Sequence, residues 1–321
     1  MDEFNAPWLE VISYGNQDAV ILTILFLMKT TEVIQKLREI DLSLYPFNEV
    51  RSLVQEFQAI KVIRITIEPG AIISRIRKGN GYNSRKDLSY PPVVACRSCQ
   101  RANLPNRTMF YGTIADSESP TVDNRVIAIS ECSSLAREGK KSKGIERFTI
   151  SNWCTTKTIR LATIVDDNVF EDIRNNTLLQ GAKSIYNEFK ILPEYDEYAR
   201  FVAAEFSKPV ENDYEYLISA AIADAYVHLS NFDGIMYPSV RIGGQAGMNI
   251  ALKPDVADSS LALLKVGELL YYKNGEHEIV IVDKLAELQS WNYFDSPAKP
   301  AMERVLKAIG ADSLSKLTVE D

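Results

Sequence analysis

Polar residues that could do chemistry occur in five short pieces along the middle of this 321-residue chain. Two pieces carry arginine, whose planar guanidinium binds phosphate groups through paired hydrogen bonds. Another carries glutamate, whose carboxylate can stabilise a positive charge that develops during a reaction. The remaining two supply a tyrosine and a serine. The five residues are Arg75, Arg101, Tyr111, Glu131 and Ser239.

Several other chemistries lack the residues that they need. The chain has only two histidines, His228 and His277, so a histidine-rich metal site or a Ser-His-Asp triad has little material. It contains no Walker loop for binding nucleotide phosphates. The sequence GGQAG at 243–247 lies between two strand-like runs and does not open a helix. This context excludes the dinucleotide-binding fingerprint and favours a flexible loop.

A zinc site is an alternative interpretation of the cysteines. Cys96 and Cys99 form a C-x-x-C pair, which supplies half of a zinc site, and Cys132 and Cys154 could complete it. A second C-x-x-C pair is missing, and the latter two cysteines lie in strand-like surroundings where buried thiols are common. We therefore expect no metal, and a metal assay on the purified protein tests this expectation.

The order of the five pieces is more informative than any one of them. Arg75 lies in a strand-like run at 72–76, RANLP occupies 101–105, FYG occupies 110–112, and a glutamate follows the apolar run at 126–130. The last piece is GIMYPSVR at 234–241. This ordered set resembles the RES domain family, which is named for its arginine, glutamate and serine. The resemblance covers about residues 70–255, and GIMYPSVR is its most specific piece.

The resemblance implies an enzyme that consumes NAD⁺ and has a fold similar to that of ADP-ribosyltransferases. Several RES proteins are toxins of toxin–antitoxin pairs. Some degrade NAD⁺ by phosphorolysis, with inorganic phosphate as co-substrate, and others are reported to transfer ADP-ribose to a protein. We therefore expect an NAD⁺ phosphorylase or glycohydrolase that needs no cofactor beyond its substrate NAD⁺. A protein antitoxin is the expected partner, and a homo-oligomer is also possible.

The resemblance also implies a role for each polar residue. Glu131 is the expected catalytic residue, because a carboxylate on the ribose hydroxyls stabilises the oxocarbenium-like sugar that forms as nicotinamide leaves. Tyr111 would stack on the nicotinamide ring. Ser239 would take part in catalysis by positioning nicotinamide, ribose or phosphate through hydrogen bonds. We disfavour Ser239 as a nucleophile because neither histidine is obviously placed to act as its base.

The arginines are the expected phosphate ligands. Arg75 would bind a phosphate of NAD⁺ and take part in catalysis, and Arg101 would bind the pyrophosphate or an inorganic phosphate. Arg75 and Arg77 would share one face of an extended strand, so either of them could be the functional arginine. A surface ion pair is the alternative role for each, and we prefer it for Arg77.

Two other functions keep part of this interpretation. An ADP-ribosyltransferase would use the same site but transfer the ribosyl group to a host protein. A catalytically idle module would bind a partner through the N-terminal helices, which could also mask the site or form a dimer contact. Labelled NAD⁺ in a cell extract separates transfer from degradation, and calorimetry with NAD⁺ tests the idle module.

Composition limits where the protein acts. The net charge of −7 and pI near 5.2 argue against a surface that binds duplex nucleic acid. The N-terminal sequence is acidic and lacks a signal-peptide pattern, and the longest apolar run, at 19–28, is too short to span a membrane, which needs about 20 residues. We expect a cytoplasmic protein with reduced thiols and no membrane contact.

The elements that must position these residues follow from local patterns. Residues 1–60 read as an N-terminal helical segment, 61–290 as the RES-type NAD-binding catalytic domain, and 291–321 as a C-terminal helix with an acidic tail. Strand-like runs occur at 62–67, 72–76, from 109, from 126, in 148–167, from 234 and from 249, and residues 170–230 are mostly helical. Strands grouped with irregular helices predict an α+β fold, with an ADP-ribosyltransferase-like mixed or antiparallel sheet and flanking helices.

Overall fold

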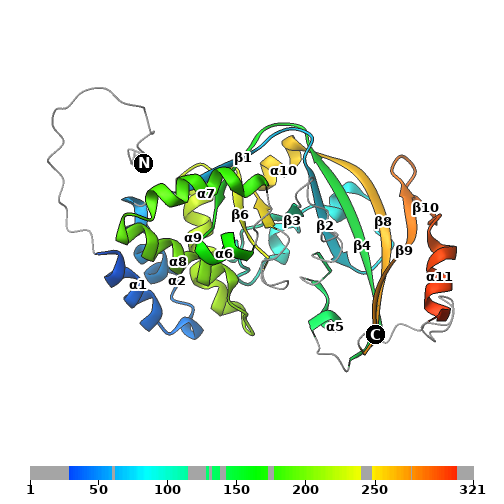
Figure 1. Cartoon of the computed structure of the whole chain (residues 1–321), viewed down its shortest axis with the longest axis horizontal. Coiled ribbons are helices and arrows are strands. Elements are labelled where there is room, and N and C mark those ends of the chain that lie inside the picture. The colour runs from blue at the N-terminus through cyan, green and yellow to red at the C-terminus, as the bar shows by residue number, and fades with distance from the viewer. Residues whose placement is uncertain are drawn as a thin grey trace.

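A ten-stranded, mostly antiparallel sheet organises the computed structural model (Figure 1). The structure describes residues 29–59, 62–114, 128–129, 132–137, 142–172, 177–239, 248–275 and 277–308. The strand order is β1-β5-β6-β7-β3-β2-β4-β8-β9-β10, and only β5 and β6 run parallel to each other. The strands are β1 (Ile63–Ile67), β2 (Ile72–Lys78), β3 (Phe110–Ile114), β4 (Lys143–Thr155), β5 (Ile159–Thr163), β6 (Gly234–Pro238), β7 (Met248–Leu252), β8 (Leu261–Asn274), β9 (His277–Glu287) and β10 (Asn292–Asp295).

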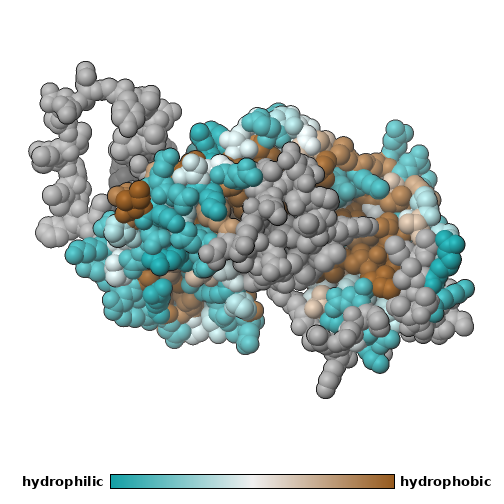
Figure 2. Space-filling view, viewed as in Figure 1, coloured by the Kyte–Doolittle hydropathy of each residue, from teal (hydrophilic) through white to brown (hydrophobic). Residues whose placement is uncertain are grey.

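Helices gather at the β1 end of this sheet, whereas β8, β9 and the C-terminal helix form the other end (Figure 1). The α+β class with flanking helices is confirmed. The surface over the helices is largely hydrophilic, and hydrophobic atoms are visible beside the long strands (Figure 2). The helices are α1 (Thr30–Glu39), α2 (Phe47–Gln55), α3 (Arg85–Leu88), α5 (Ser134–Arg137), α6 (Asp167–Asp172), α7 (Thr177–Phe189), α8 (Pro193–Ser207), α9 (Leu217–Asp224), α10 (Pro254–Ser260) and α11 (Lys299–Ala308).

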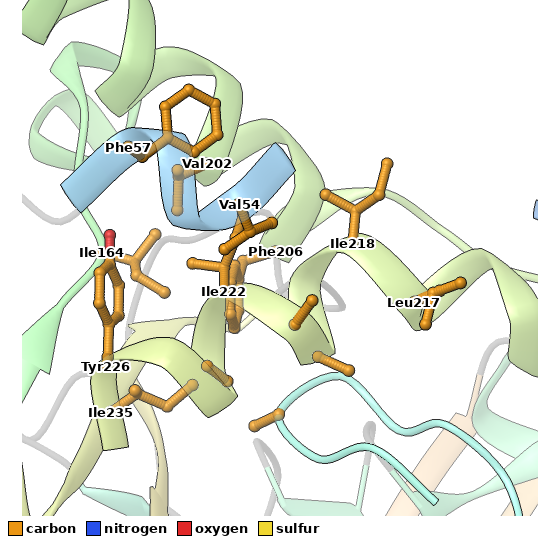
Figure 3. Close-up of a cluster of buried hydrophobic side chains, with 14 of the residues drawn as sticks. Val54, Phe57, Ile164, Val202, Phe206, Leu217, Ile218, Ile222, Tyr226 and Ile235 are labelled. Atoms are coloured by element: carbon orange, nitrogen blue, oxygen red, sulfur yellow. The ribbon is translucent and has the colours of Figure 1, made fainter. Parts of the chain in front are cut away.

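The N-terminal helices share a hydrophobic core with α8 and α9. Every residue of α9 is buried, which explains its nearly continuous apolar sequence. Val54 of α2 and Phe57, just beyond it, pack with Val202 of α8 and Ile222 of α9 (Figure 3). The predicted boundary at residue 60 therefore separates two segments that contribute to one core. That boundary and the one at residue 290 stay predictions.

A second cluster lies on the other face of β5, β6 and β7, because successive residues of these strands alternate between the two clusters. Ile65 of β1, Phe110 of β3 and Trp153 of β4 pack there with Phe170 of α6 and Tyr186 of α7. Burial alternates along β1, with its isoleucines buried and its polar residues exposed. This period of two is why the segment was recognisable as a strand. The sheet is thus covered by apolar side chains on both faces at β5, β6 and β7.

One local prediction was wrong. The apolar run from 126 was expected to be a strand, but Ala128 and Ile129 are helical, and the amide of Ser133 donates to the Ile129 carbonyl at 2.7 Å. A short apolar run has no periodicity that separates a buried helix from a buried strand. The loop at 243–247 and the apolar run at 19–28 lie outside the described residues.

No helix in the described ranges is long and apolar enough to cross a membrane.

Gly234 begins β6 at a point where the neighbouring strand leaves no room for a side chain. A Cβ there would lie 2.2 Å from the carbonyl oxygen of Ala251 and 3.0 Å from Cα of Leu252, both in the central strand β7. Because these are backbone atoms, they cannot turn aside. We expect Gly234→Ala to lower the free energy of unfolding by about 2–3 kcal/mol in urea denaturation. Gly181→Ala, in α7 with no atom within 4 Å, should instead raise it by about 0.5–1 kcal/mol.

Candidate functional site

A pocket of about 450 Å³ opens between β2, β3 and β7. Its volume falls within the range of small-molecule sites, about 300–1,000 Å³. Three of the predicted residues line it, namely Arg75 on β2, Arg101 in the loop that precedes β3, and Tyr111 on β3 itself. These residues come from separate segments, so the fold has brought together positions that were linked only by their order in the sequence.

The pocket forms because β2 and β3 separate. Their register contains Ile73–Ile114 and Ser74–Thr113 alone, whereas β4 pairs along the whole of β2. At the separation the Arg75 Nη1 donates to the Tyr111 carbonyl oxygen at 2.5 Å. The side chain therefore occupies a place where a longer strand pair would have a backbone hydrogen bond.

Arg75 is a cation without a counter-charge among the described residues. Its guanidinium lies over the ring of Phe110, 5.3 Å from the centroid, and its buried Nε has no hydrogen-bond partner in the described structure. Burial, followed by repulsion from Arg77, lowers the pKa of Arg75 to about 10. The group is still protonated at neutral pH. A half-buried positive charge with an unused donor at a pocket wall favours an anionic ligand.

Arg77 has different surroundings, although it shares the strand. Its Nη1 donates to the carbonyl oxygen of Asp87, and its guanidinium stacks on Tyr82 at 4.9 Å. It does not line the pocket. The structure therefore places Arg75 and not Arg77 at the candidate site, while a functional role for either one stays a prediction.

Arg101 lines the pocket but also closes the end of α8. Its Nη1 donates to the carbonyl oxygen of Phe206 at 2.8 Å, and its Nη2 donates to that of Lys208 at 3.0 Å. The guanidinium also lies 5.0 Å from the ring centroid of Tyr216. A cation at a helix C-terminus satisfies free carbonyls and the negative end of the helix dipole. This structural role competes with the predicted one as a phosphate ligand.

Substitution of Arg101 tests its structural role. We expect Arg101→Ala to lower the free energy of unfolding by about 1.5–3 kcal/mol, because carbonyl groups at the end of α8 lose a charged donor. Chemical denaturation without nucleotide measures this loss. Arg97→Ala is the matched control, because Arg97 is exposed and its Nε has only a 3.4 Å contact with the carbonyl of Val94. If the two variants were equally stable, Arg101 would not be needed to hold the end of α8, and the predicted role as a phosphate ligand would be favoured.

Tyr111 uses its hydroxyl to hold the turn that carries Arg101. The hydroxyl donates to Asn103 Oδ1 at 2.6 Å and accepts from the amide of Ala102 at 3.1 Å. Gln100 and Asn103 exchange backbone hydrogen bonds across this turn. Burial raises the pKa of Tyr111, so the hydroxyl stays protonated. Its ring, and not its hydroxyl, is therefore what the pocket offers to a ligand.

Glu131, the expected catalytic residue, lies outside the described residues. The pocket-lining residues nearest to it in the sequence are Ala128 and Cys132. The Cys132 Sγ donates to the carbonyl oxygen of Ile76 at 3.8 Å. Ser239, the fifth predicted residue, is buried directly after β6 and is not among the pocket-lining residues.

Sequence reasoning assigned no role to two polar side chains at this pocket, Asn249 and Tyr237. Thr113, Asn249 and Tyr237 lie side by side on β3, β7 and β6 in the sheet register. Asn249 and Tyr237 are buried and both line the pocket. The alternation of MNIAL would have placed Asn249 and Ala251 on one face of a strand, but only the register shows which face meets the pocket.

The cysteines do not form a ligand cluster. All four are described, and within the described ranges no group of three or more histidine, cysteine, aspartate or glutamate residues could hold a metal ion. Cys96 and Cys99 are buried beside the arginine-bearing turn. Burial, followed by the charge of Asp213, raises the pKa of Cys99 to about 11 and disfavours the thiolate that zinc requires.

The pocket therefore offers a half-buried guanidinium, a second guanidinium at its rim, aromatic rings and a buried amide. No protein-family model matches this chain, and no curated protein matches it. The function is accordingly inferred from the chemistry of the pocket and from the ordered motifs around it. That chemistry suits a ligand with both phosphate groups and flat rings.

Proposed function

We propose that this chain is a RES-type enzyme that binds NAD⁺ in the pocket between β2, β3 and β7 and breaks its nicotinamide–ribose bond. The observation that carries the proposal is Arg75, a protonated guanidinium at the pocket wall that has no described counter-ion and an Nε without an acceptor. A phosphate of NAD⁺ supplies the missing negative charge. The ring of Tyr111 supplies a flat surface for nicotinamide.

The reaction needs little from the protein beyond placement and charge. The bond between ribose C1 and the nicotinamide nitrogen breaks, and its electron pair stays on that nitrogen, which neutralises the cationic ring. The ribose becomes oxocarbenium-like, and a carboxylate close to its hydroxyls stabilises that charge. Glu131 is the proposed carboxylate. An oxygen of inorganic phosphate then bonds to C1 and gives ADP-ribose-1''-phosphate, or water adds and gives ADP-ribose and a proton.

The fold agrees with this proposal at a coarse level. The sheet is mixed and mostly antiparallel, and the pocket opens where two of its strands separate. We take this arrangement as ADP-ribosyltransferase-like. Ser239 follows Pro238, the last residue of β6, and lies two residues after the pocket-lining Tyr237; its proposed role is to hold the local backbone or the ligand. In the cell, we propose that the enzyme acts as a cytoplasmic toxin that a protein antitoxin neutralises.

Product analysis tests the proposal. The purified full chain is incubated with NAD⁺, with and without inorganic phosphate, and nicotinamide and the ribosyl products are separated by chromatography. We expect nicotinamide to be released. Release with and without phosphate would indicate hydrolysis, and release that requires phosphate would indicate phosphorolysis. Label from NAD⁺ on an added protein extract would instead support an ADP-ribosyltransferase. Absence of NAD⁺ binding in calorimetry would overturn the proposal and favour the non-catalytic module.

A further inference from the structure

A buried carboxylate on β4 holds the segment that follows Glu131 in the sequence. Glu146 is 8% exposed, and its two oxygens accept hydrogen bonds from the hydroxyls of Ser133 and Ser134, the latter at 2.9 Å. The ammonium of Lys78 lies 3.2 Å from the same carboxylate. The Ser133 hydroxyl in turn accepts the amide of Ala136 at 2.8 Å and so caps α5.

A second buried charge holds the same short helix from β8. Lys273 is 3% exposed, and its Nζ donates to the carbonyl oxygen of Leu135 at 3.2 Å. Its charge is paired with Glu278, also at 3.2 Å. Leu135 packs against β4 at Gly144, where a Cβ would lie 3.3 Å from Leu135 Cδ2. Glu146 and Lys273 thus hold residues 133–135 from two neighbouring strands, β4 and β8.

The helix α5 has only four residues and depends on these contacts. A single turn is not stable in isolation, so α5 exists because the sheet holds it. Buried charges are costly unless each is paired, and these two pair with α5 or with a neighbouring side chain. The element that they hold begins two residues after Cys132, which lines the pocket and is covalently bonded to Glu131.

We propose that Glu146 and Lys273 are positioning residues that anchor residues 132–137 on β4 and β8 and thereby hold the pocket wall at Cys132, the residue that follows the proposed catalytic Glu131 in the sequence. This inference rests on the proposed NAD⁺ cleavage. Neither side chain lines the pocket: Glu146 acts through the hydroxyls of Ser133 and Ser134, and Lys273 acts through the carbonyl oxygen of Leu135. The proposed NAD⁺-binding residues Arg75 and Tyr111 lie on β2 and β3, so NAD⁺ binding through them does not depend on this anchor.

The test measures steady-state nicotinamide release by the full chain and by Glu146→Ala and Ser133→Ala. We expect kcat to fall by about 10- to 100-fold with KM for NAD⁺ within about twofold, because a small displacement of a catalytic group lowers the rate of the chemical step without weakening binding. Glu146→Gln should recover part of kcat, since its amide oxygen can still accept one serine hydroxyl. In the double variant the losses should not add, because the two groups contact each other.

Glu268→Ala is the matched control. Glu268 is similarly buried on β8 and accepts the amide of Gly81 at 2.9 Å, but neither residue lines the pocket. Hydrogen exchange should accelerate at residues 128–137 in Glu146→Ala and near Gly81 in Glu268→Ala. Unchanged kcat in a folded Glu146→Ala variant, or a loss that lies in KM alone, overturns the positioning role. A wild-type chain that releases no nicotinamide overturns the proposed function itself, and exchange then reports only whether the anchor exists.

Discussion

Nicotinamide release should fall by about a thousandfold in Glu131→Gln, and NAD⁺ should still bind. The amide has the shape of the carboxylate but no negative charge, so it cannot stabilise the oxocarbenium-like ribose. Removal of one preorganised electrostatic group from an active site costs about 100- to 1,000-fold in kcat. Because this contribution appears in the transition state, the loss should lie in kcat and not in KM. Stopped assays of nicotinamide at saturating NAD⁺ measure the effect, and Glu131→Ala should behave in the same way.

The control for this prediction is Glu188→Gln, which makes the same chemical change on the exposed side of α7. It should retain the wild-type kcat and KM. Circular dichroism and thermal melting show whether each variant is folded. A folded Glu131→Gln variant with full activity would remove Glu131 from the mechanism. The pocket around Arg75 would then need another source of negative charge for the same reaction.

Arg75→Lys should lower kcat/KM for NAD⁺ by about 100-fold, mainly by raising KM. The guanidinium can keep Nη1 on the Tyr111 carbonyl while its other donors face a phosphate. A lysine ammonium is a point charge and cannot serve both partners in that geometry. Loss of hydrogen bonds between charged groups costs about 1.5–3 kcal/mol, which corresponds to roughly 10- to 100-fold in binding. Titration calorimetry with ADP-ribose and steady-state kinetics measure the two parts of this effect.

Arg77→Lys is the matched control on the same strand. Arg77 donates to Asp87 and stacks on Tyr82, outside the pocket, so its replacement should change KM by less than about threefold. A large loss in Arg77→Lys with none in Arg75→Lys would reverse the assignment of the two arginines. Equal losses would indicate that β2 as a whole, and not one guanidinium, determines binding.

The lowered pKa of Arg75 adds a pH dependence to this prediction. Binding of a phosphate needs the charged guanidinium, and the pKa of about 10 means that this form persists through neutral pH. Affinity for ADP-ribose should therefore be constant from pH 7 to about 9 and weaken as the pH rises through 10. An arginine with an ordinary pKa of 12.5 would show no such decline. Calorimetry in this range, with melting curves as the stability control, gives the measurement.

Much of the fold was predictable because its signals are local. The isoleucines of β1 alternate with polar residues, and the helical pattern between 170 and 230 repeats over several turns. The strand β8 was missed, although it is one of the longest in the sheet. Its sequence, LALLKVGELLYYKN, is apolar over most of its length and is buried on both faces in its second half, so it lacks the alternation that marks a half-exposed strand.

The candidate site was predictable only as a set of residue types in order. That order placed Arg75, Arg101 and Tyr111 in one hypothesis, and the structure places all three at one pocket. It did not show that Arg101 closes the end of α8 or that the Tyr111 hydroxyl is occupied by Asn103. Those partners lie on other segments, and no local pattern reports them.

What the sequence determined by itself is therefore the set of chemical groups and the period of each short element. Two arginines on one strand, a tyrosine on another and a glutamate after an apolar run are properties of the chain alone. Tertiary structure decided which of the two arginines meets the pocket, because that depends on where β2 and β3 separate. It also decided that Glu146 holds the turn after Cys132. Both results depend on strand register, which is set by packing between distant segments and by the burial of whole sheet faces.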